Sequence, residues 1–552
     1  MVRKTSKKLE EPYQYFGLIY PTNKSGQNEI RNLLIGNGAL NSTVYSILDY
    51  IFSPAPGSSI PICKTIVVEQ RYRDKDHTHS LSSYYYKSFH QVKSECTRLH
   101  FFSNRLSPTS LDSIGNEELS QHYMGYCVLR PFPQRKIGRT VLKRINYVPT
   151  LEFPTCHGDF PVNLVGHRLS VKGPGFMEQD TMVSACATTA LWMSTTTIGQ
   201  RFNLRQSSTA EITQMATEYL ISSRPMPSEG LLLEQMVHCL RKLSYDPLVI
   251  GRTDSVRVKH EIYTYIESEL PPIILCELLS GGDHAIVGIG HGYHLPITNP
   301  FKISVDWPGE MPIQISRSSE WIPHFLINDD QRGLFRKLSF LDPTTWRQQL
   351  QNASITINTS DARFDEWNCP VTIDENYPNA GENRGQQIAN IWAVIVPLPK
   401  GVLLTVEQAE KKSARLIKLW HYWNSLSVPT DLVLRTYLVQ SNEYKERIKK
   451  TAVNDFVKSL IISKPMPRWI WVSEISSTNS YNSSNPTNWL INGQIIIDAT
   501  GNAFTSDFLL FHYVSGNDGI VATMTPEHED AEQAFDRYWV SNTDHSYQGW
   551  VR

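Results

Sequence analysis

Cys186 stands where a glycine-containing loop gives way to ACATTALWM, a run of small and apolar residues that predicts a helix. A nucleophilic cysteine must be a thiolate near neutral pH, whereas an ordinary thiol titrates at about 8.5. The positive end of a helix and a neighbouring imidazolium both stabilise a thiolate. The small neighbours Ala185 and Ala187 leave room for a substrate carbonyl. A cysteine in an apolar helix is more often a buried structural thiol, so the prediction depends on the residues that accompany it.

His284 is the candidate for the general base that such a cysteine requires. It opens the apolar run HAIVGIG directly after two glycines and an aspartate, and this run predicts a central β-strand. A histidine at the start of a buried strand is held rigidly, and its imidazole can take and return the thiol proton. Taken alone, it is equally well explained as a surface histidine where a strand begins.

A third group must accept a hydrogen bond from the second imidazole nitrogen and so orient the ring. The segment LINDDQRG ends a short predicted strand and offers Asn328, Asp329 and Asp330, of which we select Asp329. Asn and Asp also favour turns regardless of function, so the other two stay open. Gln179, seven residues before Cys186, is the candidate side-chain donor to an oxyanion, together with the backbone N–H of Cys186.

These residues resemble the papain-like cysteine peptidases, in local pattern the C39-like group, over roughly residues 165–340. That group has a Gln ahead of a Cys at a helix start, a His that opens a strand, and an Asp in a segment like NDPxxG. Here the segment is NDDQRG, which places Asp329 at the matching position and Asp330 where the proline would be. Ala187 replaces the glycine that usually follows the cysteine.

The resemblance implies an α+β protein whose central papain-like fold packs the cysteine helix on an antiparallel sheet, flanked by two mixed α/β domains. It implies a hydrolase that cleaves a peptide or isopeptide bond of a protein or peptide substrate, with no cofactor and no metal. The flanking parts resemble a bacterial group with the same three-part layout, which suggests a regulated protease in stress response or defence. Two alternatives stay open: a transglutaminase-like acyltransferase with an amine acceptor, and a catalytically silent scaffold that binds a peptide.

The length of 552 residues predicts about three domains. We divide the chain into a disordered tail over 1–13, a mixed α/β domain over 14–155, the peptidase domain over 156–345 and a second mixed α/β domain over 346–552. The separation of His284 from Asp329 requires an insertion at about 292–320, which we expect to be a surface excursion rather than a lid. Amphipathic patterns predict helices over 406–423 and 431–450.

The composition excludes several other classes of function. The net charge is -1, so no basic surface points to nucleic acid or an anionic membrane. No stretch reaches the roughly 18 apolar residues of a membrane-spanning helix. The eight cysteines form no CxxC pair, which favours reduced thiols over disulfides or zinc. We therefore expect a cytoplasmic protein, with a regulatory protein as a second candidate partner beside the substrate.

Overall fold

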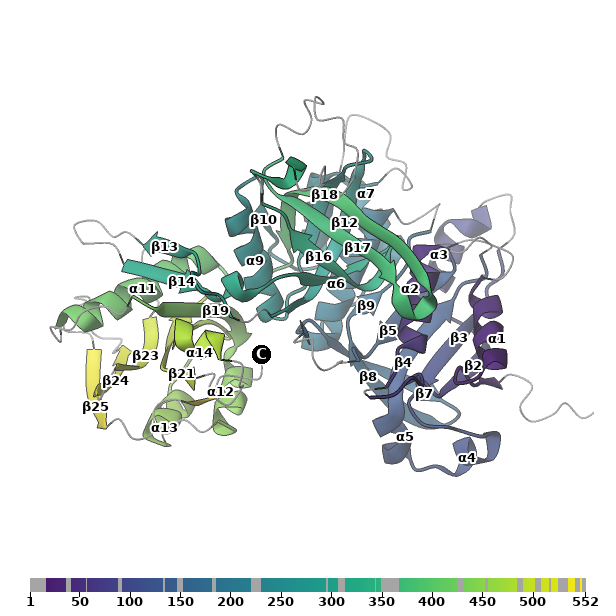
Figure 1. The fold of residues 1–552 in the computed structure, drawn as a ribbon, viewed down its shortest axis with the longest axis horizontal. Coiled ribbons are helices and arrows are strands. Elements are labelled where there is room, and N and C mark those ends of the chain that lie inside the picture. Colours follow the sequence, from purple (N-terminus) through teal and green to yellow (C-terminus); the bar gives the residue numbers. More distant parts are fainter. Residues whose placement is uncertain are drawn as a thin grey trace, which may run out of the picture.

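In the computed structural model the chain forms three bodies that follow one another along an arc, with the central body between the other two (Figure 1). The fold is α+β, and nearly all of its strand pairs are antiparallel. The structure describes residues 16–35, 41–55, 57–87, 92–132, 135–145, 152–180, 185–219, 230–293, 296–305, 313–342, 344–348, 367–423, 430–451, 455–483, 490–501, 508–515, 518–524, 535–541 and 547–548. The predicted disordered tail over 1–13 lies outside these residues.

The N-terminal body is built on an antiparallel sheet in the order β1-β2-β3-β4-β5-β9. These strands are β1 (Phe16–Ile19), β2 (Thr65–Tyr72), β3 (Cys96–Phe102), β4 (Tyr123–Leu129), β5 (Ile137–Leu142) and β9 (Gly175–Phe176). The hairpin of β7 (Gly158–Leu164) and β8 (His167–Gly173) alternates buried and exposed side chains, and its buried side chains share a core with β2, β3 and β4. The helices of this body are α1 (Lys24–Ile35), α2 (Ser42–Phe52), α3 (Lys75–Ser83), α4 (Pro108–Ser113) and α5 (Asn116–His122).

The central body is a six-stranded antiparallel barrel. The strands run in the order β18-β11-β12-β15-β16-β17, and the long strand β18 closes the ring by pairing with both β11 and β17. The strands are β11 (Ile273–Leu278), β12 (Asp283–Gly292), β15 (Phe325–Asp329), β16 (Gly333–Phe340), β17 (Pro370–Tyr377) and β18 (Glu382–Val396). Two short strands, β10 (Leu248–Ile250) and β6 (Glu152–Pro154), extend it by pairing with β18 and β12.

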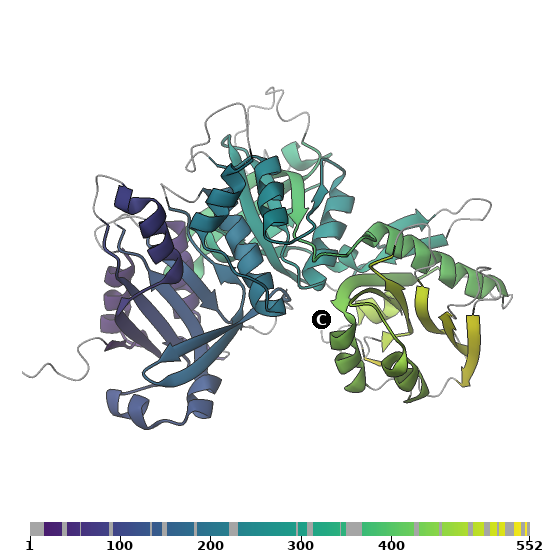
Figure 2. The ribbon, with the colours of Figure 1, turned by 180° about the vertical axis from the view of Figure 1, so that it is seen from behind.

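Helices between β9 and β11 cover this barrel, as Figure 2 shows from behind. They are α6 (Cys186–Phe202), α7 (Thr209–Thr217), α8 (Leu233–Lys242) and α9 (Ser255–Glu267). Both α6 and α9 pack on β12, which is buried along its whole length after Asp283. At Gly288 a Cβ atom would lie only 3.0 Å from Ile266 Cδ1, so the absence of a side chain lets α9 approach the strand closely.

The C-terminal body contains a sheet in the order β13-β14-β19-β20-β22-β23-β24-β25. Its strands are β13 (Lys302–Val305), β14 (Ile313–Arg317), β19 (Leu432–Gln440), β20 (Trp469–Ser477), β22 (Gly493–Asp498), β23 (Phe508–Ser515), β24 (Asp518–Met524) and β25 (Phe535–Ser541). Its helices are α11 (Val406–Trp423), α12 (Ser441–Lys449), α13 (Asp455–Ser463) and α14 (Thr478–Asn482). No helix among the described residues is long and apolar enough to cross a membrane.

The three bodies do not divide the chain at the predicted domain boundaries, 155/156 and 345/346, because strands on either side of these points pair across them. The hairpin β7–β8 and strand β9 belong to the N-terminal body, although the sequence assigned them to the peptidase domain. Strands β17 and β18 complete the central barrel, although the sequence assigned them to the C-terminal domain. The predicted insertion at 292–320 contributes β13 and β14 to the C-terminal sheet, because β14 pairs in parallel with β19.

A buried ion-pair network joins the central and C-terminal bodies. Arg435 on β19 donates from Nε to Glu267 Oε2 at 2.6 Å and from Nη1 to Glu474 Oε2 at 2.7 Å. Glu267 lies at the end of α9, and its Oε1 is 2.6 Å from His291 Nε2 on β12. Burial alone would raise the pKa of Glu267, but Arg435 and His291 together lower it to about 2.

We expect Arg435→Met to lower the free energy of unfolding by about 3–5 kcal/mol at pH 7, because it leaves Glu267 charged and buried without its main partner. The folded-state pKa of Glu267 is depressed, so its contribution is present above the ordinary glutamate value of about 4.3 and is lost as the pH falls towards 2. Urea unfolding at pH 7 and pH 3 measures both effects. Arg205→Met, which breaks an exposed pair with Glu211, should cost less than about 1 kcal/mol. If Arg435→Met lowered the free energy of unfolding as little as Arg205→Met does, the buried network would not be the stabilising contact described.

Candidate active site

Cys186 is the first residue of α6 and lies at the junction of that helix with the barrel. The preceding residue, Ala185, has an extended backbone (φ -82°, ψ 173°) and provides no side-chain cap. The first N–H groups of α6 are therefore not satisfied by a capping side chain, and they point towards the cysteine end of the helix. Cys186 is partly exposed, whereas the other seven cysteines, all within the described residues, are buried.

His284 lies at the start of β12, where the chain enters the barrel between β11 and β15. Its side chain is fully buried, and the residue opposite it on the neighbouring strand β11 is Cys276. The side chain of Cys186 lies close enough to the imidazole to contribute to raising the pKa of His284. The Nδ1 atom also lies 3.5 Å from the Gln331 amide nitrogen. The structure thus brings together the cysteine and histidine that the sequence singled out.

Asp329, the last residue of β15, holds the opposite side of the imidazole. Its Oδ1 lies 3.0 Å from His284 Nε2 and also accepts hydrogen bonds from the backbone N–H groups of Gln331 (2.8 Å) and Arg332 (3.1 Å). Its Oδ2 accepts a 3.0 Å hydrogen bond from Arg332 Nη1. The carboxylate is fully buried and compensated by these donors, so it is fixed in the position that orients the ring.

The electrostatics of the pair favour a charged imidazole. Burial opposes the charge, but the Asp329 carboxylate, its hydrogen bond to the ring and the Cys186 side chain raise the pKa of His284 well above its ordinary value of about 6.5. Burial likewise opposes the charge of Asp329, but His284 and Arg332 lower the pKa of that carboxyl below its usual range. At neutral pH the pair is therefore an imidazolium and a carboxylate, the form of histidine that stabilises a thiolate.

The two alternatives to Asp329 occupy different positions. Asn328 is buried and bonds elsewhere, with its amide donating to Gly175 O at 3.1 Å and its Oδ1 accepting from Phe335 N at 3.3 Å. Asp330 Oδ1 lies 3.8 Å from His284 Nε2, but neither carboxylate oxygen has a hydrogen-bond partner among the described residues. Burial raises the pKa of Asp330 to about 7, with the charge of Asp329 adding to the effect. Asp329 is thus the better-placed partner of the imidazole.

Gln179 follows β9 in a half-buried position on the segment that leads to Cys186. The preceding residue, Glu178, anchors this segment: its carboxylate accepts from Asn41 Nδ2 (2.6 Å), Thr43 Oγ1 (2.9 Å) and the Ile137 N–H (3.0 Å). The N-terminal body therefore positions the main chain beside Gln179. The role of Gln179 as an oxyanion donor stays a prediction.

His284, Asp329 and Asp330 also form a group that could offer one ligand atom each to a metal, since these atoms lie within 4.8 Å of one another. The chemistry of the group does not fit an ion. Asp329 already accepts from four N–H groups, one of them a guanidinium, and the Arg332 charge would repel a cation at that carboxylate. The arrangement instead fits an orienting carboxylate for the imidazole.

Sequence reasoning missed three residues that shape the site. Gln331 and Arg332 lie within the segment NDDQRG. The amide and the guanidinium directly after the candidate aspartates could have indicated donors to those carboxylates. Arg332 also donates to Glu375 on β17, which ties the aspartate to the next strand of the barrel. Glu178 directly precedes Gln179, but nothing in the sequence showed that it would be buried.

Comparison with protein-family models finds no match to the chain, and a search of curated proteins finds none either. The geometry of the site therefore carries the functional argument.

Replacing each aspartate in turn distinguishes the partner of the imidazole. We expect Asp329→Asn to lower the pKa of His284 towards or below about 6.5, because burial then acts against the charged ring with its main compensating charge removed. Asp330→Asn should leave the pKa of His284 raised. Histidine-selective NMR titration measures both values, with His284→Gln to assign the signal. If the pKa of His284 fell further in Asp330→Asn than in Asp329→Asn, Asp330 would be the residue that orients the imidazole.

Proposed function

We propose that this protein is a cysteine peptidase-like hydrolase that cleaves a peptide or isopeptide bond through Cys186, His284 and Asp329. The observation that carries the proposal is that the His284 imidazole lies between the Cys186 side chain, which helps to raise its pKa, and the Asp329 carboxylate at 3.0 Å. Nucleophile, base and orienting carboxylate follow one another in the order of a catalytic triad. The partial exposure of Cys186 also supports the proposal, because a nucleophile must be reached by its substrate.

We further propose that the central body is a papain-like fold. In support, the helix that begins at the nucleophile packs on an antiparallel barrel. The base and the carboxylate lie on β12 and β15, which are neighbours in that barrel. This is the arrangement that the resemblance to C39-like peptidases implies.

In the proposed reaction the Cys186 thiolate attacks the substrate carbonyl carbon and forms a carbon–sulfur bond. The imidazolium of His284 then gives its proton to the nitrogen of the leaving amine as the carbon–nitrogen bond breaks, which leaves a thioester. A water molecule attacks the thioester while His284 takes one of its protons. The carboxylic acid product departs and the thiolate is restored, so no external oxidant or reductant is required.

The tetrahedral intermediate carries an oxyanion that needs donors in place before the reaction. The N–H of Cys186 at the start of α6 is one candidate, and the side-chain amide of Gln179 is the other. The hydrogen bonds of Glu178 to the N-terminal body hold the Gln179 segment. We propose that the N-terminal body thereby contributes to the oxyanion site.

We place the protein in the cytosol, since all eight cysteines are free thiols. Thiols stay reduced in that compartment, and a cysteine nucleophile requires a reduced sulfur. The substrate class that this chemistry implies is a protein or peptide.

The proposal predicts selective alkylation of one thiol. Iodoacetamide should modify Cys186 ahead of the seven buried cysteines, and Cys186→Ala should remove the rapid phase of labelling. His284→Ala should slow it about 100-fold or more, because the imidazolium that stabilises the thiolate is lost. Cys276→Ala, which removes a buried thiol across the strand from His284, is the matched control and should label as the wild type does. Peptide mapping by mass spectrometry identifies the labelled residue.

Product analysis distinguishes hydrolysis from the two alternatives. We expect incubation with a proteome-derived peptide library to yield new carboxyl termini in the wild type and none in Cys186→Ala or His284→Ala. Incorporation of an added primary amine in place of water would make the protein an acyltransferase. Rapid alkylation of Cys186 without any acyl product would leave a binding scaffold, and would overturn the proposed hydrolysis.

A further inference from the structure

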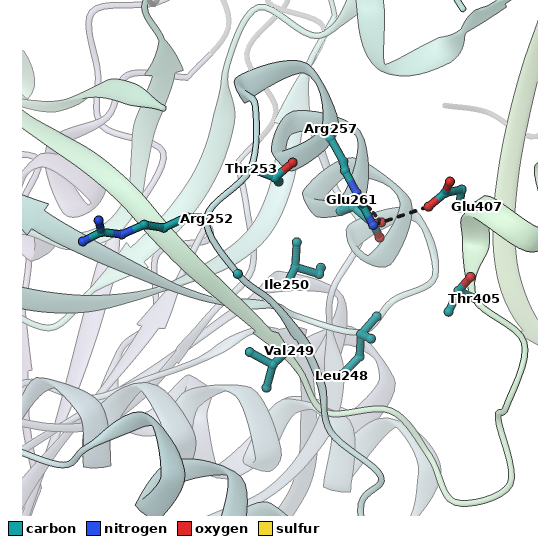
Figure 3. A pocket seen from close by; sticks show the side chains of 10 residues that line it. Leu248, Val249, Ile250, Arg252, Thr253, Arg257, Glu261, Thr405 and Glu407 are labelled. Atoms are coloured by element: carbon teal, nitrogen blue, oxygen red, sulfur yellow. Dashed lines mark ion pairs between the residues drawn. The ribbon is translucent and has the colours of Figure 1, made fainter. Parts of the chain in front are cut away.

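A second site lies away from the cysteine, at the junction of the central and C-terminal bodies. A cavity of about 310 Å³ is bounded by β10, the start of α9 and the start of α11. A second cavity of about 290 Å³ adjoins it and shares three of its lining residues: Arg257, Glu261 and Glu407. Cavities of this size accommodate small ligands, and they occur preferentially between domains. Figure 3 shows the first cavity, with the apolar side chains of β10 on one side and those of Arg257, Glu261 and Glu407 on the other.

Among the residues that line this cavity, Glu261 is unusual because a buried oxygen of its carboxylate has no hydrogen-bond donor in the described part of the chain. Its side chain is only 7% exposed, and its Oε1 lies 3.9 Å from Arg257 Nε, too far for a hydrogen bond. Its Oε2 has no hydrogen-bond partner among the described residues. A buried carboxylate oxygen without a donor is costly and needs an explanation. Burial raises the pKa of Glu261 to about 7, although Arg257 acts in the opposite direction.

The cations near Glu261 are already occupied by other carboxylates. Arg257 also pairs with Glu407 at 3.4 Å, so its charge is shared between two glutamates (Figure 3). Arg317 of β14 donates from Nε to Glu410 Oε2 at 3.0 Å, and Glu410 is in addition paired with His260. In Figure 3 the Arg252 side chain points away from Glu261. Among the described residues, therefore, no cationic side chain lies within hydrogen-bond distance of the Glu261 carboxylate.

We propose that this cavity binds a small molecule with one protonated amine or guanidinium group on a short aliphatic body. The cation would pair with the Glu261 carboxylate, and the body would pack against Leu248, Val249 and Ile250 of β10. A metal ion is disfavoured because it needs several oxygen ligands, and Glu407 is already engaged by Arg257 and Lys411. The site does not depend on the proposed hydrolase chemistry.

Such a ligand would link two bodies of the protein. Glu261 belongs to α9, which covers the central barrel, whereas Glu407 lies in the first turn of α11 of the C-terminal body. The other end of α9 carries Glu267, the residue in the buried network with Arg435. A ligand seated between α9 and α11 would therefore stabilise the junction at a second point, and binding should raise the melting temperature of the full chain.

The test uses butylguanidinium as the probe and the full-length protein. We expect saturable binding by isothermal titration calorimetry and a rise in melting temperature, with at least a tenfold weaker affinity in Glu261→Gln. Because only the ionised carboxylate pairs with the cation, affinity should increase about tenfold from pH 6 to pH 8 as Glu261 loses its proton. Butylurea, the uncharged isostere, should bind the wild type at least tenfold more weakly.

Glu446→Gln is the matched control, since it removes an exposed glutamate of α12 and should leave the affinity unchanged. Glu261→Gln removes a buried charge without changing side-chain volume, and its own melting curve shows whether it is folded. Absence of binding to the wild type would overturn the proposal, as would equal affinity for butylguanidinium in folded Glu261→Gln. Equal binding of butylurea would show that the cavity does not select a cation, and would overturn it too.

Discussion

The contact between Asp329 and His284 is the constraint on which the centre of this molecule depends. Two opposite charges with no solvent exposure lie 3.0 Å apart, and an unpaired charge at either position would be strongly destabilising. The cost of desolvation is offset because Asp329 is saturated with donors: two backbone N–H groups from the turn that follows it and the Arg332 guanidinium. The turn between β15 and β16 thus has an electrostatic role as well as a connecting one.

The barrel satisfies this constraint across a long stretch of chain. His284 and Asp329 are 45 residues apart in sequence, yet β12 and β15 are adjacent strands. Between them the chain leaves the barrel and contributes β13 and β14 to the C-terminal sheet before it returns. The far end of β12 carries His291, which contacts the Glu267–Arg435 network. The strand that carries the candidate base near its start is therefore fixed at that end by Asp329, and at the other end it is linked through Glu267 to Arg435 of the C-terminal body.

Sequence reasoning singled out side chains that the fold brings together, whereas the strand pairing divides the chain at other points than the predicted domain boundaries. The residue types and their order along the chain singled out Cys186, His284 and Asp329, because each stands at the boundary of an apolar segment whose type was predictable. The long-range pairing of β17 and β18 with the barrel was not predictable, since local patterns do not specify which sheet a strand joins. The same limit applies to β13 and β14.

One segment was assigned the wrong secondary structure, and its burial explains why. The segment 431–450 was predicted as one amphipathic helix, but its first half is the strand β19 (Leu432–Gln440) and only the second half is the helix α12 (Ser441–Lys449). Eight of the nine residues of β19 are buried, so the apolar run LVLRTYLV faces protein on both sides. A fully buried run has no polar face to reveal its period, and a strand and a helix then look alike in sequence. The arginine within it, Arg435, is buried only because two glutamates surround it, a compensation that the sequence alone could not show.

Buried carboxylates in this protein differ in whether the fold supplies their donors. Asp329, Glu178 and Glu267 each accept several hydrogen bonds, and each fixes one element against another. Asp330 and Glu261 retain oxygens without a partner among the described residues, and burial raises the pKa of both to about 7. Next to His284, a carboxyl that is readily protonated leaves Asp329 as the main charge that orients the ring. In the cavity at the junction, the same property leaves Glu261 able to exchange its proton for a cation. The carboxylates of Asp329, Glu178 and Glu267 thus fix elements of the fold against one another, whereas Asp330 lies at the candidate active site and Glu261 lines the proposed ligand cavity.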